Sequence, residues 1–275
     1  MPELPEVEAV RRSLAPFLTQ TRIADVEVRR PDLRVPFPRR FRARLVNQTV
    51  VSLTRRAKYL LAALSSSETL IVHLGMSGSF RVDSQGAGSD AAADTDRHDH
   101  VVIHMSSGAA VTFNDPRRFG LMTLLTQAQL ARHPVLSRLG PEPLSPRFDA
   151  AALARACRGR KTALKVALLD QRIVAGIGNI YASEALHRAG LSPFRRASTI
   201  ATASGAARQA AERLTEAIKH VLTAAIDRAS AAYRSSRFRV YDREGERCLR
   251  RGCGGIIRRR AQAGRSTFYC PVCQR

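Results

Sequence analysis

Four of the five cysteines of this 275-residue chain stand in two close pairs near its C-terminal end. The pairs are Cys248-x4-Cys253 and Cys270-x2-Cys273, with sixteen residues between them. Each pair can clasp one side of a tetrahedral ion, and Zn²⁺ can fold a segment too small to hold its own core. We predict one structural zinc ion here. Two disulfides are the alternative, but the chain lacks the features of secreted proteins, in which such bridges form.

The segment that carries these cysteines is also the most basic part of the chain. From Arg234 onward it holds 12 arginines, no lysine and three acidic residues, and the whole chain has a formal net charge of +22. This excess indicates a polyanionic partner, and nucleic acid fits best. A membrane surface is the competing partner. It is disfavoured because no apolar stretch approaches about 18 residues and the N-terminus lacks the order of a signal peptide.

The first half of the chain reads as one helix followed by strands. Residues 4–18 predict a helix, because Pro5 suits its first turn, Glu6 and Glu8 complement its positive end, and apolar residues recur at helical spacing. Between about Ile23 and Leu125, short runs of strand-forming residues predict an antiparallel sandwich or barrel. The runs are TVVSLT, YLLAAL, TLIVHL, SFRV, HVVIHM, AAVTF and LMTLLT. The Gly-, Ser-, Ala- and Asp-rich stretch 83–96 predicts a mobile loop.

The second half is predicted to be mainly helical. LGPEPLSPRFD (139–149) is rich in proline and indicates a linker, and helices are predicted at 149–158, 162–169, 179–189 and 205–226. The basic run Arg258–Arg260 and Arg265 should lie on a zinc-stapled β-hairpin that reaches phosphates, with a solvated charged face as the alternative. Cys157, on a predicted helix, is expected to be a small buried residue.

These elements define an α+β multidomain fold. We expect an N-terminal antiparallel β-sandwich with flanking helices at 1–138, a linker at 139–148, a helical domain at 149–233 and a zinc-bound β-hairpin at 234–275.

Motifs spread along the chain add a more specific indication. In chain order they are PELPEVE, RRAKYLL around Lys58, HLGMSGSFRV from His73, HDH at 98–100, NDPRRFG from Asn114, LGPEPL, GIGNIYASEAL from Gly176, VYDREGE and FYCPVCQR. Together they resemble the formamidopyrimidine-DNA glycosylase family, bifunctional base-excision repair enzymes that remove oxidised purines and nick the abasic site. The resemblance implies a bacterial, cytoplasmic and nucleoid-associated monomer. It also implies a helix–two-turn–helix element and a partner of double-stranded DNA with a damaged base or abasic site.

The N-terminal residues can be interpreted chemically. If the initiator methionine is removed, Pro2 supplies a secondary amine, and at an α-amino pKa of about 7.7–8.0 a tenth or more of it is neutral at pH 7. The positive end of the helix disfavours protonation further. Attack on C1′ of the damaged nucleotide would expel the base and leave an iminium, which favours β-elimination of the 3′ phosphate.

The resemblance assigns three further catalytic residues. Glu3 matches the family's general acid, although an ordinary acid at a helix start is the alternative. Lys58 matches the lysine that assists β-elimination. Arg265 matches the arginine assigned to δ-elimination. Because arginine stays protonated, we expect its role to be electrostatic at least as much as proton donation.

An enzyme that acts on a base must take it out of the stack and fill the gap. Met76, Arg117 and Phe119 match the family's void-filling residues, although Met76 and Phe119 taken singly read as core residues. Asn179 matches a phosphate-binding position at a helix start, with a plain N-cap as the alternative. The other expected DNA contacts are His98, Arg117, Lys165 and a basic site at Arg160 or Lys161.

Two features depart from the family pattern. The first cysteine pair is spaced x4 where x2 is commoner, which still suits zinc. Between the helix predicted to end near Asp227 and VYDREGE, family members carry a longer segment that includes the loop over the flipped 8-oxoguanine. This chain has only RASAAYRSSRFR there. We therefore expect a weakened or altered 8-oxoguanine preference, with formamidopyrimidines and oxidised pyrimidines still processed.

Two other functions stay open on the sequence alone. One is an endonuclease VIII-like specificity for oxidised pyrimidines, against which PELPE and DPRRFG favour the formamidopyrimidine branch. The other is a catalytically silent DNA-binding protein. The presence of Pro2, Glu3 and Lys58 argues against silence.

Overall fold

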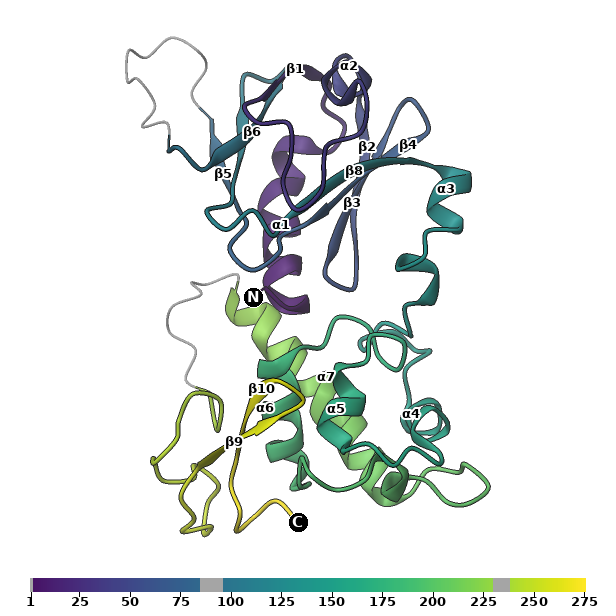
Figure 1. The fold of residues 1–275 in the computed structure, drawn as a ribbon, viewed down its shortest axis with the longest axis vertical. Coiled ribbons are helices and arrows are strands. Elements are labelled where there is room, and N and C mark those ends of the chain that lie inside the picture. The colour runs from purple at the N-terminus through teal and green to yellow at the C-terminus, as the bar shows by residue number, and fades with distance from the viewer. Residues whose placement is uncertain (1, 85–95, 230–237) are drawn as a thin grey trace. The chain divides into compact units, whose positions relative to one another are not determined.

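The computed structural model describes residues 2–84, 96–229 and 238–275 (Figure 1). The chain divides into two compact units, unit 1 (Met1–Ser137) and unit 2 (Arg138–Arg275), and each contains a hydrophobic core of its own. Most of the loop predicted at 83–96 and most of RASAAYRSSRFR lie outside the described residues. Among the described residues, no helix is long and apolar enough to cross a membrane.

Unit 1 is a sandwich of two four-stranded antiparallel sheets, as predicted. One sheet has the order β1-β6-β7-β5 and the other β2-β3-β4-β8. Its core lies between them, since buried residues of both sheets, such as Phe113 and Met122, belong to one cluster. The strands are β1 (Ile23–Val28), β2 (Val50–Arg56), β3 (Tyr59–Leu64), β4 (Glu68–His73), β5 (Ser79–Asp83), β6 (Asp99–Met105), β7 (Ala110–Asn114) and β8 (Leu121–Thr126).

Helix α1 (Leu4–Leu18) confirms the predicted helix and buries Val7, Leu14 and Leu18 in the sandwich core. The sequence did not predict α2 (Phe41–Leu45) or α3 (Gln127–Ala131). Each has only five residues, too few to show a helical period.

Unit 2 begins as a group of helices. They are α4 (Ala150–Cys157), α5 (Leu164–Leu169), α6 (Asn179–Ala189) and α7 (Gln209–Ala229), with single 3₁₀ turns at Leu136–Arg138 and Ala197–Ile200. Buried Cys157 belongs to their core, as predicted. Helix α7 begins four residues later than predicted, because the Thr202 hydroxyl accepts the Ala206 N–H (3.0 Å) in a turn where Gly205 has φ +91°.

The C-terminal segment holds the predicted hairpin. Strand β9 (Arg258–Gln262) pairs antiparallel with β10 (Arg265–Tyr269). Ala263 and Gly264 form the two-residue turn, and both have positive φ, the conformation that matches the twist of a tight hairpin. A small core of Val240, Ile257, Phe268 and Cys270 lies behind it, so the cysteine cluster is part of this core.

Candidate active site and nucleic-acid interface

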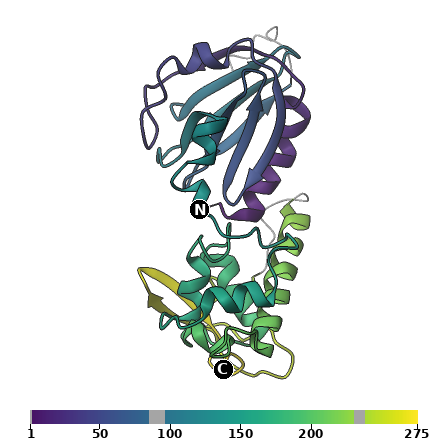
Figure 2. The same ribbon diagram turned by 90° about the vertical axis from the view of Figure 1, so that its right-hand side faces the viewer.

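The start of α1 lies beside the end of β2. Arg11 donates to the Leu53 carbonyl (3.4 Å), and one turn nearer the N-terminus Glu8 pairs with Arg55 (3.3 Å). Burial acts to raise the pKa of Glu8, but Arg11, Arg12 and Arg55 outweigh it and hold that pKa below its ordinary value. Helix and strand run in opposite directions, so the N-terminus and the β2–β3 turn share one end of unit 1 (Figures 1 and 2).

Glu3 is the N-cap of α1 and is only 2% exposed. Its backbone N–H donates to the Glu6 carboxylate (2.8 Å), and its side chain accepts the backbone N–H of Glu6, which makes a reciprocal capping box. Half-buried Pro2 precedes it at the positive end of the helix. The acid predicted for proton transfer is therefore also the cap of the helix that follows.

Lys58 occupies the tight turn between β2 and β3 and is 8% exposed. The turn requires a left-handed residue, Ala57 at φ +53°, and the Arg55 guanidinium donates to the Ala57 carbonyl (2.9 Å). Because Arg55 also pairs with Glu8 of α1, one side chain fixes the turn and attaches it to the helix that begins at Glu3. The local fold thus brings Glu3 and Lys58 to the same end of unit 1.

His73 ends β4 beside this turn. Burial, followed by the charges of Lys58 and Arg34, lowers the pKa of His73 to about 4, so its imidazole is neutral at pH 7. Its Nδ1 accepts the Gly75 N–H (3.0 Å). Gly75 has φ +62°, and a side chain there would overlap the backbone of Phe119. The histidine therefore fixes the start of the loop that carries Met76.

Asp115 holds three segments that carry predicted DNA contacts. Its buried carboxylate accepts the Ser77 hydroxyl (2.6 Å) and the Gly120 N–H (2.8 Å). Its own backbone N–H donates to the His98 carbonyl (3.0 Å), and its carbonyl lies 2.9 Å from Nε2 of His100. One residue thus fixes the segment of His98, the loop after β4 and the loop before β8.

The predicted void-filling side chains project from the loop after β4 and the loop before β8. Met76 and Phe119 are 43% and 44% exposed, so the alternative of core residues is wrong for both. The Arg117 guanidinium lies 4.7 Å from the centroid of the Phe119 ring, and its backbone N–H donates to Ser77 (3.2 Å). These two exposed apolar side chains and the stacked arginine stand on loops that Asp115 holds in place. Such a group of side chains suits insertion between stacked nucleobases.

We expect Asp115→Ala to lower the free energy of unfolding by about 2–4 kcal/mol, because two donors to a carboxylate lose their acceptor. Asp115→Asn, which keeps one acceptor oxygen, should cost less. Urea unfolding measures the stability, and fluorescence of 2-aminopurine placed opposite the lesion measures base-stack insertion. Unchanged stability and insertion in the alanine variant would show that the loops hold without Asp115.

In unit 2, Lys165 has a structural role at the start of α6. It is 1% exposed, and its ammonium donates to Asn179 Oδ1 (2.6 Å), the Ser266 carbonyl (3.0 Å) and Thr267 Oγ1 (2.8 Å). Asn179 also donates to Ser266 (2.9 Å), and Gly178, not Asn179, is the N-cap. Contact with a lesion strand would require this ammonium to leave its acceptors, so we now expect Lys165 to position Asn179 and the hairpin.

The other predicted basic contacts of unit 2 are exposed. Arg265 stands directly after the hairpin turn. Arg160 donates to the Ala156 carbonyl (2.7 Å) and lies 3.9 Å from Asp170, whereas Lys161 has no hydrogen-bond or ion-pair partner among the described residues. Of the two candidate positions, Lys161 is the cation available to a phosphate, and its role stays a prediction.

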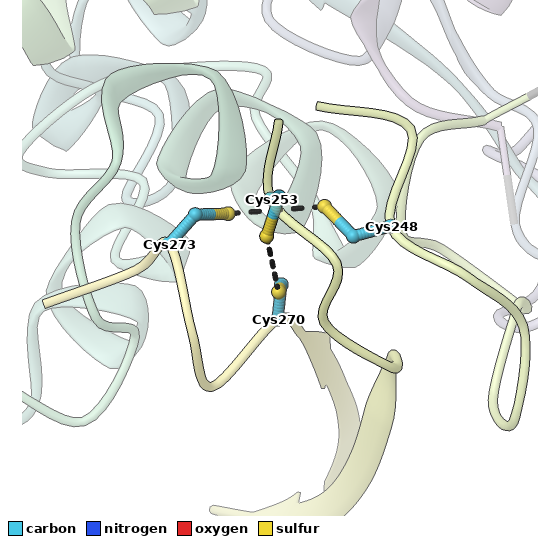
Figure 3. Close-up of side chains that lie close together, drawn as sticks. All are labelled: Cys248, Cys253, Cys270 and Cys273. Atoms are coloured by element: carbon cyan, nitrogen blue, oxygen red, sulfur yellow. Dashed lines mark hydrogen bonds between the residues drawn. The ribbon is translucent and has the colours of Figure 1, made fainter. Parts of the chain in front are cut away.

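The four cysteines converge at the base of the hairpin (Figure 3). Their sulfur atoms all lie within 4.8 Å of one another, with Cys248–Cys273 at 3.8 Å and Cys253–Cys270 at 3.5 Å. Four sulfurs at about 2.3 Å from a tetrahedral ion are about 3.8 Å apart, whereas a disulfide is about 2.05 Å long. The spacing fits one zinc ion and rules out two disulfides.

His187 of α6 contacts this cluster. Its Nε2 lies 3.3 Å from Cys248 Sγ. Burial, followed by the charges of Arg250, Arg239 and Arg243, lowers the pKa of His187 to about 4. A neutral ring whose Nε2 carries the proton donates to the sulfur. Such contacts orient metal ligands, so α6 connects the zinc cluster to Asn179 at its other end.

Sequence reasoning missed Asp115, His73 and His187 as supports of the site. Asp115 and His73 stand inside the motifs NDPRRFG and HLGMSGSFRV, shortly after the strand runs AAVTF and TLIV, so the signal was a polar residue at the end of a predicted strand. His187 gave no such signal, because its partner is a cysteine distant in sequence.

Three family models match consecutive parts of the chain. The formamidopyrimidine-DNA glycosylase N-terminal domain matches residues 1–122, the H2TH domain of the same glycosylase matches residues 139–236, and a zinc finger found in FPG and IleRS matches residues 245–275.

Curated relatives match from end to end. Proteins of Azorhizobium caulinodans and Rhodopseudomonas palustris, both named formamidopyrimidine-DNA glycosylase, are each 55% identical to this chain with 100% of both chains covered. Their alignments run over 293 and 294 residues, more than the 275 of this chain.

Solved structures of a formamidopyrimidine-DNA glycosylase are also similar to this chain over its whole length. The Lactococcus lactis glycosylase bound to DNA with an abasic site is 30% identical, with 99% of both chains covered and a TM-score of 0.86. The same enzyme with oxidised-pyrimidine DNA is 30% identical, with 100% of both chains covered and a TM-score of 0.87.

Proposed function

The chain belongs to the formamidopyrimidine-DNA glycosylase family, and on this premise we propose that it excises oxidised bases from duplex DNA and then cleaves the abasic strand. It is a base-excision repair glycosylase with AP lyase activity. The observation that carries this proposal in the chain's own residues is the antiparallel packing of α1 on β2. That packing places Pro2, Glu3 and Lys58 at one end of unit 1.

Each of these groups has a step to perform. The neutral amine of Pro2 attacks C1′ of the damaged nucleotide, the C1′–N bond to the base breaks, and the proton that the amine gives up neutralises the departing base. Glu3, which follows Pro2 in the sequence and whose side chain is oriented by the capping box, donates a proton to the sugar ring oxygen, and the opened sugar carries an iminium bond to Pro2. Loss of a proton from C2′ then expels the 3′ phosphate. Lys58 assists this elimination.

The charged residues of unit 2 would act on the DNA backbone. Arg265, at the end of the hairpin, stabilises the phosphates that leave. Asn179 and the backbone N–H groups at the start of α6 hold a phosphate, as helix N-termini do. Met76, Arg117 and Phe119 enter the gap left by the flipped nucleotide.

Borohydride trapping on lesion-containing duplex DNA tests the proposal. Reduction of the iminium should join protein and DNA covalently in a 1:1 adduct, and Pro2→Gly, which supplies a primary amine, is the comparison. A preparation that binds the duplex but gives no adduct on any lesion or abasic site would establish the alternative of a silent DNA-binding protein.

The substrate preference follows from the short segment between α7 and VYDREGE. Without the loop that covers flipped 8-oxoguanine, we expect the rate ratio of 8-oxoguanine to formamidopyrimidine excision to be about tenfold below that of a loop-bearing relative, because one lost set of hydrogen bonds is worth about 1–2 kcal/mol. Single-turnover excision of both lesions measures the ratio. Equal ratios in the two enzymes would contradict the expectation, and a preference for oxidised pyrimidines would favour the endonuclease VIII-like alternative.

The remaining expectations concern organisation and setting. We propose that the chain works as a cytoplasmic, nucleoid-associated monomer. We also propose that residues 139–148 link the catalytic sandwich to the helical domain at 149–233, with the zinc hairpin at 234–275 completing the DNA-binding surface. Sedimentation with and without duplex DNA measures the stoichiometry.

A further inference from the structure

Unit 2 has a basic groove at the C-terminal end of α6, where α6, α7 and the segment before the hairpin meet. Its main cavity has a volume of about 740 Å³. A second cavity of about 160 Å³ shares Arg188, His220 and Arg239 with it and extends toward Phe238. Five arginines and one lysine line the main cavity: Arg188, Arg213, Lys219, Arg239, Arg250 and Arg251.

The positive charge of this groove is not balanced by the protein. In the part of the chain that the structure describes, none of its arginine or lysine side chains lies within ion-pair distance of a carboxylate, whereas nearby Arg243 pairs with Glu246 (2.7 Å). Glu216 is the acid that lines the main cavity. Glu184, in the smaller one, is occupied by the backbone N–H groups of Arg239, Val240 and Tyr241, each at 2.9 Å.

Hydrogen bonds hold the segments that form the groove in place. Arg250 donates to the carbonyls of His187 and Arg188, so it neutralises the negative end of α6 and attaches the cysteine segment to that helix. Glu184 holds the backbone at Arg239 from the same helix. Arg188, Arg213 and Arg251 are exposed and carry their charge into the groove from three separate segments.

The groove and the predicted phosphate site at Asn179 lie at opposite ends of α6. Asn179 and Arg188 lie at opposite ends of α6, about 14 Å apart at 1.5 Å per residue. The Lys165 network attaches the hairpin to the end that carries Asn179. A DNA backbone held at that end leaves the basic groove open to another anion.

We propose that the basic groove binds the phosphodiester backbone of a second DNA segment while the first is held at the lesion site. The inference rests on the proposed function, since a DNA-bound glycosylase is surrounded by duplex phosphates. Exposed guanidinium groups along an open groove match successive phosphates, to which arginine donates in a fork. The protein would then bridge two duplex segments and could move from one to the other without first dissociating from DNA.

A capture experiment tests this. The protein is first joined to an immobilised lesion duplex by borohydride, and a labelled undamaged duplex is then added at about 50 mM salt, where backbone contacts are strong. The test variant is Arg188→Glu with Arg213→Glu and Arg251→Glu. A matched variant, Arg39→Glu with Arg132→Glu and Arg147→Glu, changes the charge equally at exposed positions outside the groove.

We expect wild type and the matched variant to capture the second duplex and the groove variant to capture at least tenfold less. The slope of log affinity against log salt should fall by about 3 when three phosphate contacts are lost. Capture that is equal in both variants would overturn the inference, as would a groove variant that loses binding of polyglutamate but not of duplex. Failure to form the first adduct would instead count against the proposed function, so the two failures are distinguishable.

Discussion

Replacing Glu3 by glutamine should reduce base excision at least about 100-fold, because a positioned general acid contributes about 10²–10⁴ to a rate. The same change should lower the free energy of unfolding by less than about 1 kcal/mol, the typical value of a whole N-cap. Glutamine keeps an oxygen that accepts the Glu6 N–H, and the Glu3 backbone N–H still donates to Glu6. The variant therefore removes the proton and preserves the capping box.

Glu6→Gln is the matched control, since it makes the same chemical change in the other carboxylate of the box. We expect near wild-type excision from it. Single-turnover excision on a formamidopyrimidine duplex and urea unfolding are measured for both variants. Equal loss of excision in both would mean that Glu3 acts only through the start of α1.

The elements that sequence predicted well are those defined by neighbouring residues. Helix α1 begins with proline and acids and continues with an apolar stripe, and α6 has the predicted bounds 179–189. The hairpin was predicted from the cysteine pairs around it, and its Ala263–Gly264 turn has the required positive φ. In each case a few adjacent side chains decide the backbone conformation, so one sequence is sufficient.

The parts of the site that sequence did not predict depend on distant partners. The sequence did not predict the buried network of Lys165, whose ammonium donates to acceptors on Ser266 and Thr267, about a hundred residues away. Asp115 joins three loop segments that stand next to different strands of the sandwich. A local pattern shows that such residues are polar. It does not show whether the fold places a hydrogen-bond partner next to them.

Removing zinc should weaken binding of a lesion duplex at least about 100-fold, because structural zinc contributes about 10–16 kcal/mol to the folding of such segments. Without the ion, the hairpin core around Cys270 loses the bond that closes it. Gly255 packs so closely that a Cβ would lie 2.6 Å from Cys270 Sγ, so even a small shift disturbs this core.

The loss should spread from the hairpin to α6. The Lys165 ammonium donates to Asn179, Ser266 and Thr267. If β10 moves, the acceptors on Ser266 and Thr267 are lost and the one on Asn179 stays. Loss of two hydrogen bonds by a buried ammonium costs several kcal/mol, so the start of α6 should rearrange with the hairpin. Unit 1 has its own core and should keep its β-sheet circular dichroism.

Chelation followed by return of zinc measures this effect, and Cys270→Ser makes it permanent. Cys157→Ala is the matched control, since Cys157 is also buried in unit 2 but lies outside the cluster. It should keep one zinc ion per chain and bind the lesion duplex as wild type does. If Cys270→Ser lost its zinc and still bound with wild-type affinity, the hairpin would fold without metal. Lys165 would then hold the start of α6 independently of the zinc cluster.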